Sequence, residues 1–198
     1  MPEPSDISAK QDVELVAASR EGDMEAYEEL VHRHRDKIYA RAFSMVRNEE
    51  QALDLSQEAW IKAWQRLHQF HGDASFATWI TRITINLSLD FLRKAKRQRA
   101  ESVEALEENS GGVERHLPVT NPNPTARLER AELRSKIDLA LAKLSEDHRT
   151  VLILHEFEEL QYKEIAERVG CSIGTVMSRL FYARRKMAVA MKELLGEG

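Results

Sequence analysis

The chain contains few of the residues that mark disulfide-bonded, metal-bound or β-rich proteins. Cys171 is the single cysteine among 198 residues, which excludes an internal disulfide and a multi-cysteine metal site. We expect it to be a small buried residue in a turn. Only 8 glycines and 5 prolines occur, and no alternating Val/Ile/Thr/Tyr blocks bounded by turn residues predict strands. Abundant Ala, Leu, Glu, Lys and Arg favour helices, so we predict an all-α fold.

Long apolar runs are also absent. The longest aliphatic run, residues 151–154, is far shorter than a membrane span, and the polar, acidic residues 1–4 do not resemble a signal peptide. We therefore expect a cytoplasmic protein that makes no membrane contact of its own.

Signatures of catalysis are missing too. The sequence has no glycine-rich phosphate loop, no serine elbow and no histidine pair with the spacing of a zinc protease. We expect no enzyme, no cofactor and no metal, and we expect the seven histidines to lie at the surface. The net charge of −4 argues against tight DNA binding by the whole chain. A DNA-binding surface must therefore be local, or must act together with a partner.

Hydrophobic spacing predicts two small helical domains joined by a flexible acidic linker. The expected helices of the first domain cover 12–20, 23–47, 48 to about 70, and 75 to about 99. Those of the second cover 125–144, 145–157, 162–169 and a last helix from Ser172, with Thr125 and Ser145 as N-caps. The domains are predicted at 10–99 and 125–198, and the polar segment 100–124 is the linker. The third helix is expected to bury an apolar stripe made of Leu53, Trp60, Ala63, Trp64 and Leu67.

A helix-turn-helix signature lies near the C-terminus. Ala166 is small where two helices cross closely, and Gly170 can take the left-handed conformation that the tight turn requires. Ser172 is suited to cap the second helix, and Val176 to pack it back on the first. This spacing is typical of DNA-binding helix-turn-helix motifs. A motif of this kind also docks on proteins in some cases, so it does not establish function alone.

The second helix of this motif is basic on its exposed side. No acidic residue occurs from Ser172 to Met187. Its N-terminal half is expected to read base edges, and its later residues to contact phosphates. The residues expected at the DNA are Ser172, Thr175, Met177, Ser178, Arg179, Phe181, Tyr182, Arg184 and Arg185, with Lys186 as a further phosphate contact. A basic amphipathic helix with a solvated face is the alternative interpretation.

The first half carries a second set of motifs. Residues 54–64 keep Asp54, Gln57 and Glu58 one turn apart, on a face expected to lie opposite Trp60 and Trp64. Residues 70–86 join a Gly-Asp loop to an aromatic-rich helix. Together with 144–152 and the helix-turn-helix, these strings resemble the extracytoplasmic-function (ECF) sigma factors, a small two-domain class. The resemblance covers about 26–97 and 134–187.

This resemblance implies an alternative sigma factor, which binds core RNA polymerase, recognises the −10 and −35 promoter elements and directs transcription initiation. By resemblance, Asp54, Gln57 and Glu58 would dock on the clamp helices of the polymerase's largest subunit, and the helix-turn-helix residues named above would bind the −35 element. The −10 set implied by the resemblance is Phe70, Gly72, Asp73, Ser75, Thr78, Arg82, Asn86, Arg93, Lys94 and Arg97. An anti-sigma factor is a further implied partner, and the linker would pass toward the RNA exit path of the polymerase.

Promoter opening requires unpaired bases to be held outside the stack. Extruding a base costs a few kcal/mol, which stacking and edge hydrogen bonds must recover. Phe70 is a candidate stacking surface, worth about 1–3 kcal/mol for one base, and Asn86 is a candidate base-edge reader. Core packing of Phe70 is the alternative, as it is for Phe76 and Trp79. Met177 cannot make the bidentate guanine contact of an arginine, so the −35 sequence stays open.

Two other functions fit parts of the sequence. An ordinary regulator would bind a duplex palindrome tightly as a dimer without polymerase. A helical scaffold would use its helix-turn-helix for protein contacts and would show no dependence on DNA. A gel-shift assay with and without core polymerase separates these alternatives.

Overall fold

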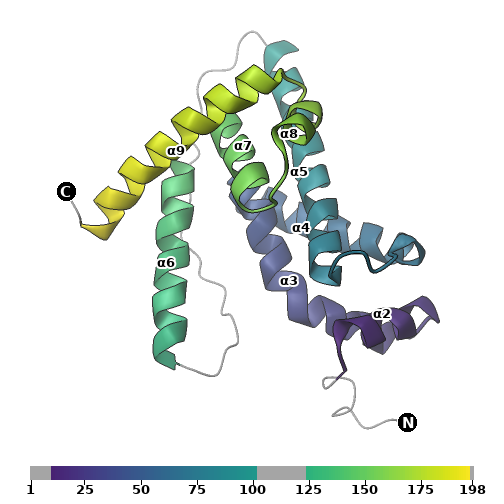
Figure 1. The fold of residues 1–198 in the computed structure, drawn as a ribbon. Coiled ribbons are helices and arrows are strands. Elements are labelled where there is room, and N and C mark those ends of the chain that lie inside the picture. Colours follow the sequence, from purple (N-terminus) through teal and green to yellow (C-terminus); the bar gives the residue numbers. More distant parts are fainter. Residues whose placement is uncertain (1–9, 102–123, 197–198) are drawn as a thin grey trace. The chain divides into compact units, whose positions relative to one another are not determined.

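The computed structural model describes residues 10–101 and 124–196. Within these ranges every regular element is helical, as predicted. The elements are α2 (Asp12–Arg20), α3 (Met24–Val46), α4 (Glu49–Gln65), the 3-10 turn η1 (Leu67–Gln69), α5 (Phe76–Glu101), α6 (Pro124–Ala142), α7 (Glu146–Glu156), α8 (Tyr162–Val169) and α9 (Ile173–Leu195) (Figure 1). They form two compact units: the first contains α2, α3 up to Phe43, α4 and α5, and the second contains α6 to α9 together with residues 44–47 at the end of α3. Most of the predicted linker, residues 102–123, lies outside the described residues.

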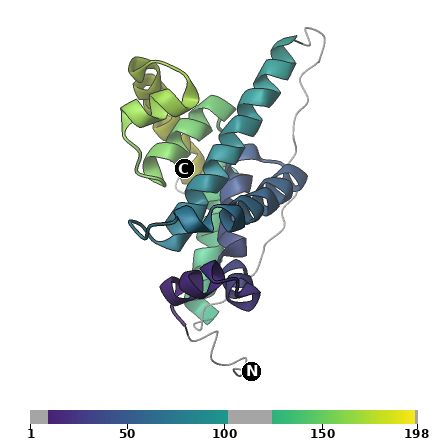
Figure 2. The same cartoon turned by 90° about the vertical axis from the view of Figure 1, so that its right-hand side faces the viewer.

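The first unit is built around one aromatic and aliphatic core, whose helices can be followed from a second side in Figure 2. Leu15 and Val16 of α2 pack with Leu30 of α3 and Ile80 of α5. Tyr27 is also buried, and its hydroxyl donates to the carbonyl oxygen of Trp60 at 2.6 Å. Burial raises the pKa of this phenol above its usual range. The core thus fixes α2, α3, α4 and α5 against each other.

The second unit packs its long last helix against the three helices before it. The run Val151–Leu154 of α7 is buried, as are Ile165 of α8 and Leu180 of α9. Ala183 of α9 and Leu141 of α6 are buried as well. This small core positions α8 and the exposed side of α9.

Several helix boundaries differ from the predictions. The α-helix that starts after Asn48 ends at Gln65, and only the short turn η1 carries the chain toward Phe70. Helix α6 begins at Pro124, one residue before the predicted cap Thr125. Ser145 does precede α7, but its hydroxyl pairs with Nδ1 of His148 at 2.8 Å and caps no backbone N–H.

The predicted buried stripe of α4 is wrong at Leu53, which is half exposed. The buried side of this helix is lined mainly by the small residues Ala52, Ala59 and Ala63. Trp60 and Trp64 are only partly buried, at the edge of the core. The polar face of α4 is therefore opposite the alanines and not opposite the tryptophans.

Two further expectations also change. Cys171 is half-buried, not fully buried. His34, His148 and His155 are half-buried and not fully at the surface. Nε2 of His34 pairs with Oδ2 of Asp12 at 2.7 Å, and Nδ1 of His155 lies 3.0 Å from the carbonyl oxygen of Leu160. Across the described residues, no helix has the length and apolar character needed to cross a membrane. No three His, Cys, Asp or Glu side chains gather there as metal ligands.

Candidate nucleic-acid interface

The turn between α8 and α9 has the geometry that the sequence predicts. Gly170 ends α8 with φ +73° and ψ +45°, the left-handed conformation that glycine adopts without strain. The carbonyl oxygen of Ala166 accepts the N–H groups of Gly170 at 2.9 Å and Cys171 at 3.0 Å. Ser172 then caps α9, because its hydroxyl accepts the Thr175 N–H at 3.1 Å. The two helices are therefore set as a helix-turn-helix.

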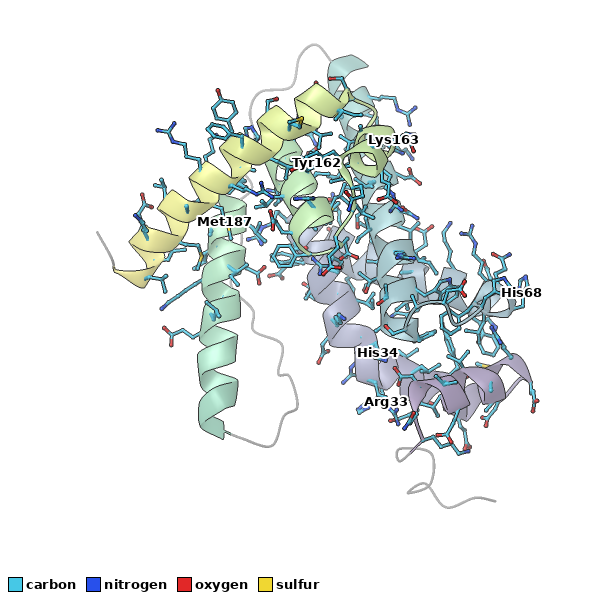
Figure 3. All side chains as sticks on the ribbon, viewed as in Figure 1. Arg33, His34, His68, Tyr162, Lys163 and Met187 are labelled. Carbon is cyan, nitrogen blue, oxygen red and sulfur yellow. The ribbon has the colours of Figure 1, made fainter. Side chains whose placement is uncertain are left out.

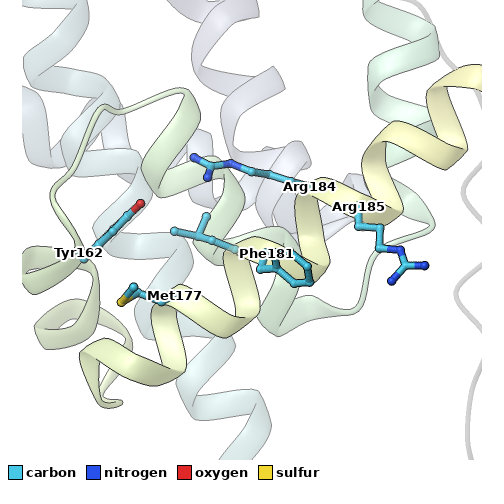
Figure 4. Close-up of a pocket in the computed structure, with 6 residues that line it drawn as sticks. Tyr162, Met177, Phe181, Arg184 and Arg185 are labelled. Carbon is cyan, nitrogen blue, oxygen red and sulfur yellow. The ribbon is translucent and has the colours of Figure 1, made fainter.

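The N-terminal half of α9 presents a face with large side chains to solvent. Met177, Phe181 and Tyr182 are each more than half exposed. A hollow on this face is lined by Tyr162 of α8 and by five residues of α9, namely Met177, Leu180, Phe181, Arg184 and Arg185 (Figure 4). The expected base-reading residues thus lie on one accessible surface, with Ser178 exposed and Thr175 half-buried beside them.

Two positions on this face were missed from the sequence. Ile173 is exposed at the start of α9, although its type suggests a core residue. Gly174 lies in the first turn, where a Cβ atom would meet only the Ser172 hydroxyl, at 3.8 Å. Packing within the protein therefore does not require a glycine at this position. A glycine without a packing role in the first turn of the helix is the feature that points to a functional role for Gly174.

The arginines of α9 differ in how they are held. Arg179 donates to Oδ2 of Asp147 at 2.6 Å and is mostly covered, so it ties α9 to α7. Arg184 donates through Nε to Oε1 of Glu156 at 2.8 Å, and this hydrogen bond raises the pKa of the guanidinium. Arg185 is exposed. The side chain of Arg185 is therefore the most accessible of the three for a phosphate.

The loop that precedes α5 is fixed at both ends. Phe70 is only 7% exposed, and its ring packs edge-on against Phe76 with centroids 6.1 Å apart. The ring of Phe70 therefore lies in the core. The prediction that it offers an open stacking surface to an extruded base is wrong. Gly72 has φ +85°, and Gly72, Asp73 and Ser75 are exposed. The Ser75 hydroxyl accepts the Thr78 N–H at 3.1 Å and so caps α5.

One side of α5 carries the predicted polar face. Arg82 and Asn86 are exposed, and Thr78 is half-buried one turn earlier. Further along, Arg93 is exposed and donates to Oδ1 of Asp90 at 2.9 Å. Lys94 and Arg97 are exposed as well. Because residues four apart share a helix face, the side chains expected at the −10 element follow one continuous surface from the loop to the basic end of α5.

The polar residues expected at the polymerase lie on the exposed side of α4. Asp54, Gln57 and Glu58 are exposed there. They share this side with two apolar residues that were not predicted, Leu53 and Ile61, which are 50% and 58% exposed. Leu53 and Ile61 therefore add exposed apolar surface to the polar side of α4.

Comparison with known proteins agrees with this arrangement. The family model described as Sigma-70 region 2 matches residues 30–98, and the model described as Sigma-70, region 4 matches residues 134–187. The RNA polymerase sigma-H factor of Pseudomonas aeruginosa is 35% identical over 191 residues, which cover 96% of this chain and 99% of the relative. The ECF RNA polymerase sigma-E factor of Escherichia coli K12 is 34% identical over 185 residues, covering 91% and 94% of the two chains. The chain belongs to the ECF family of RNA polymerase sigma factors.

The resemblance stated from the sequence is thus confirmed, and with it the function of an alternative sigma factor that directs transcription initiation. The family acts as initiation factors, not as enzymes. Among solved structures, the sigma factor RpoE of Bartonella quintana, crystallised with the anti-sigma factor NepR, is similar over 86% of this chain and 96% of its own, with 24% identity and a TM-score of 0.49.

Proposed function

We propose that three exposed faces divide the work of this sigma factor. The α4 face, around Asp54, Gln57 and Glu58, binds the clamp helices of the polymerase's largest subunit. The loop 70–75 and the polar side of α5 bind the −10 element and hold its melted strand. The exposed half of α9 binds the −35 duplex. The observation that carries this proposal is that each predicted set, Phe70 and Arg179 apart, forms an accessible surface on a helix whose other side is buried.

The proposed contacts are physical, and no covalent step is part of them. Asn86 carries both a donor and an acceptor, which suits it to read one base edge. Phe70 acts from within the core, by supporting the loop. Arg82, Arg93, Lys94 and Arg97 supply charge for the phosphates that flank the opened strand.

On α4 the proposal includes the two exposed apolar residues. Leu53 and Ile61 bury their side chains against the polymerase, while Asp54 and Glu58 meet cationic groups around them. Such an arrangement, an apolar centre with a charged rim, is typical of specific protein interfaces.

Membership of the sigma factor family also supports proposals about the place of action and about a regulatory partner. Because the polymerase works on the chromosome, we propose the cytoplasm as the place of action. Sigma factors of this family are commonly held by an anti-sigma factor, and we propose a partner of this class for the present chain. The linker, by resemblance, passes toward the RNA exit path.

Promoter binding with and without core polymerase tests the function. Labelled genomic fragments are incubated with the purified chain alone, with core enzyme alone and with both, and run-off transcription is measured in parallel. We expect negligible binding by the chain alone and specific transcripts only in the complete mixture. Tight palindrome binding without core would contradict the proposal and favour an ordinary regulator.

The polymerase-binding face is tested with the variant Ile61→Asp. A charge at an exposed position leaves the core intact, and a carboxylate in a buried protein interface is costly. We expect at least a tenfold weaker affinity for core enzyme in a competition assay. Val13→Asp, which changes an exposed residue of α2, is the matched control, and equal losses in both variants would remove the α4 face from the interface.

A further inference from the structure

Helix α2 precedes the region matched by the sigma-70 models, which starts at residue 30. It is nevertheless part of the first core, where Leu15 and Val16 are buried. Its N-terminal end is attached to α3. There Asp12 pairs with Arg33 at 3.2 Å and with His34 at 2.7 Å, two neighbouring side chains labelled in Figure 3. This end of α2 is thus held in a fixed place on α3.

The other end of α2 reaches the turn before the loop. Arg20, the last residue of the helix, donates through Nε to the carbonyl oxygen of Leu67 at 3.1 Å. The same oxygen accepts the N–H of Phe70 at 3.2 Å. Arg20 therefore completes the hydrogen bonding of the 3-10 turn from which the loop 70–75 departs.

Arg20 also covers the ring of Phe70. The centre of its guanidinium lies 5.9 Å from the ring centroid, within the range of a cation–π contact. Phe76 and Trp79 approach the same ring, Trp79 with centroids 5.4 Å apart. Phe70 is thus held by aromatic side chains of α5 and by a cation from α2.

From these contacts we propose that α2 is a brace for the strand-capturing loop, with Arg20 as its positioning residue. The inference rests on the proposed function, because it assigns a support to the loop that holds the melted −10 strand. A loop held in its binding conformation loses less conformational entropy when the strand arrives. Arg20 itself touches no DNA; it acts through Leu67 and Phe70.

The expected effect is a loss of strand capture at constant polymerase affinity. In Arg20→Ala, both contacts with the turn and the ring disappear. We expect the equilibrium constant for promoter opening by the holoenzyme to fall about tenfold, the size typical of losing one hydrogen bond from a charged donor. In Arg20→Lys, which keeps the charge and one donor, we expect opening to recover in part.

Opening is measured by the fluorescence of 2-aminopurine placed in the −10 strand of a promoter found by run-off transcription. Affinity of the holoenzyme for the single-stranded −10 oligonucleotide is measured beside it, together with affinity for core enzyme. Arg35→Ala is the matched control, because it removes the same charge from an exposed side chain of α3. If the alanine variant unfolds, Arg20→Gln replaces it, since its amide still donates but no longer places a cation over the ring.

The outcomes separate the two proposals. Failure of the unmodified holoenzyme to open any promoter overturns the proposed function and the brace with it. Normal opening by the unmodified chain, with equal opening by Arg20→Ala and Arg35→Ala, overturns only the brace. A parallel loss of core affinity in Arg20→Ala also overturns it, because that result indicates a general structural defect.

Discussion

Arg184, which we propose contacts DNA, already shares its charge with a carboxylate inside the free protein. Its guanidinium lies 2.6 Å from a carboxylate oxygen of Glu156, and both side chains are nearly half exposed. Exposed pairs of this kind contribute about 0–1 kcal/mol to stability. Glu156 therefore contributes little to the stability of the fold. Its main expected effect is to reduce the positive charge that Arg184 offers to a phosphate.

We expect Glu156→Gln to strengthen promoter binding about threefold at low salt, because it removes a negative charge and releases Arg184 toward phosphate. The measurement is the affinity of the holoenzyme for a −35-containing duplex across a salt series. Glu167→Gln, at an exposed position of α8, is the control. Weaker binding by Glu156→Gln alone would contradict the prediction, and would mean that the carboxylate orients Arg184.

A second residue-scale prediction concerns acid sensitivity. Burial, together with the positive charges of Lys186 and Arg179, lowers the pKa of His148 below 6.5, against the opposing effect of Asp147. The unfolded chain therefore takes up this proton first as the pH falls through about 6.5, the ordinary histidine value, so the free energy of unfolding decreases below it. Above about pH 7.5 both states are neutral at this site and the contribution is constant.

Urea unfolding of the full chain and of His148→Gln at pH 5.5 and 7.5 measures this effect. We expect the unmodified protein to lose more stability than the variant between the two pH values, since glutamine does not titrate. Loss of the Ser145 contact affects the variant at both pH values, so only the difference between them counts. Equal losses would show that His148 is not the group responsible.

At the scale of the helix, sequence predicts where elements begin better than where they end. Asp23 and Asn48 each cap the following helix through the side chain, as expected from their types. Their bonds are local, and a local pattern suffices to find them. The end of α4 at Gln65 and the exposure of Leu53 depend on the partners of this helix in the core. Those partners lie far away in sequence.

The same distinction applies to the candidate site. The turn at Gly170 and the cap of α9 at Ser172 follow from neighbouring residues, and the sequence predicted them. The pair of Arg179 with Asp147 joins residues 32 apart, and the position of Phe70 in the core depends on Phe76 and on α2. A one-dimensional pattern carries no information on such contacts, so predicted DNA residues such as Phe70, Arg179 and Arg184 have partners that only the fold reveals.

The first turn of α9 gives a prediction at this scale. Glycine is a poor helix former, and Gly174 has room for a methyl group. Gly174→Ala should therefore stabilise the protein by about 0.5 kcal/mol in urea unfolding, while the added methyl weakens −35 binding where the DNA backbone approaches closely. Ala188→Gly, at an exposed position later in α9, should show the reverse change in stability with unchanged affinity. Unchanged affinity in Gly174→Ala would exclude close approach of DNA at this turn.

At the scale of the molecule, the proposed function assigns different parts of promoter recognition to the two compact units. The chain has a net charge of −4, so the chain as a whole is not expected to hold DNA tightly alone. In the proposed function, polymerase supplies the missing affinity, and each unit adds sequence information at its own promoter element. On this view the functional site is distributed over surfaces of both units and is not one central pocket.

If the two units act in separate steps, variants in one unit and variants in the other should impair transcription independently. Asn86→Ala should lower promoter opening while leaving core affinity intact, and Arg185→Ala should lower initial promoter affinity and reduce the salt slope by about one. Because changes at distant sites usually add in free energy, the run-off signal of the double variant at limiting holoenzyme should fall by the product of the two single losses. Lys163→Ala, an exposed residue of α8, is a charge control that should leave all three quantities unchanged. A double variant no worse than the more impaired single one would contradict the division of labour, since it would mean that both residues act in the same step.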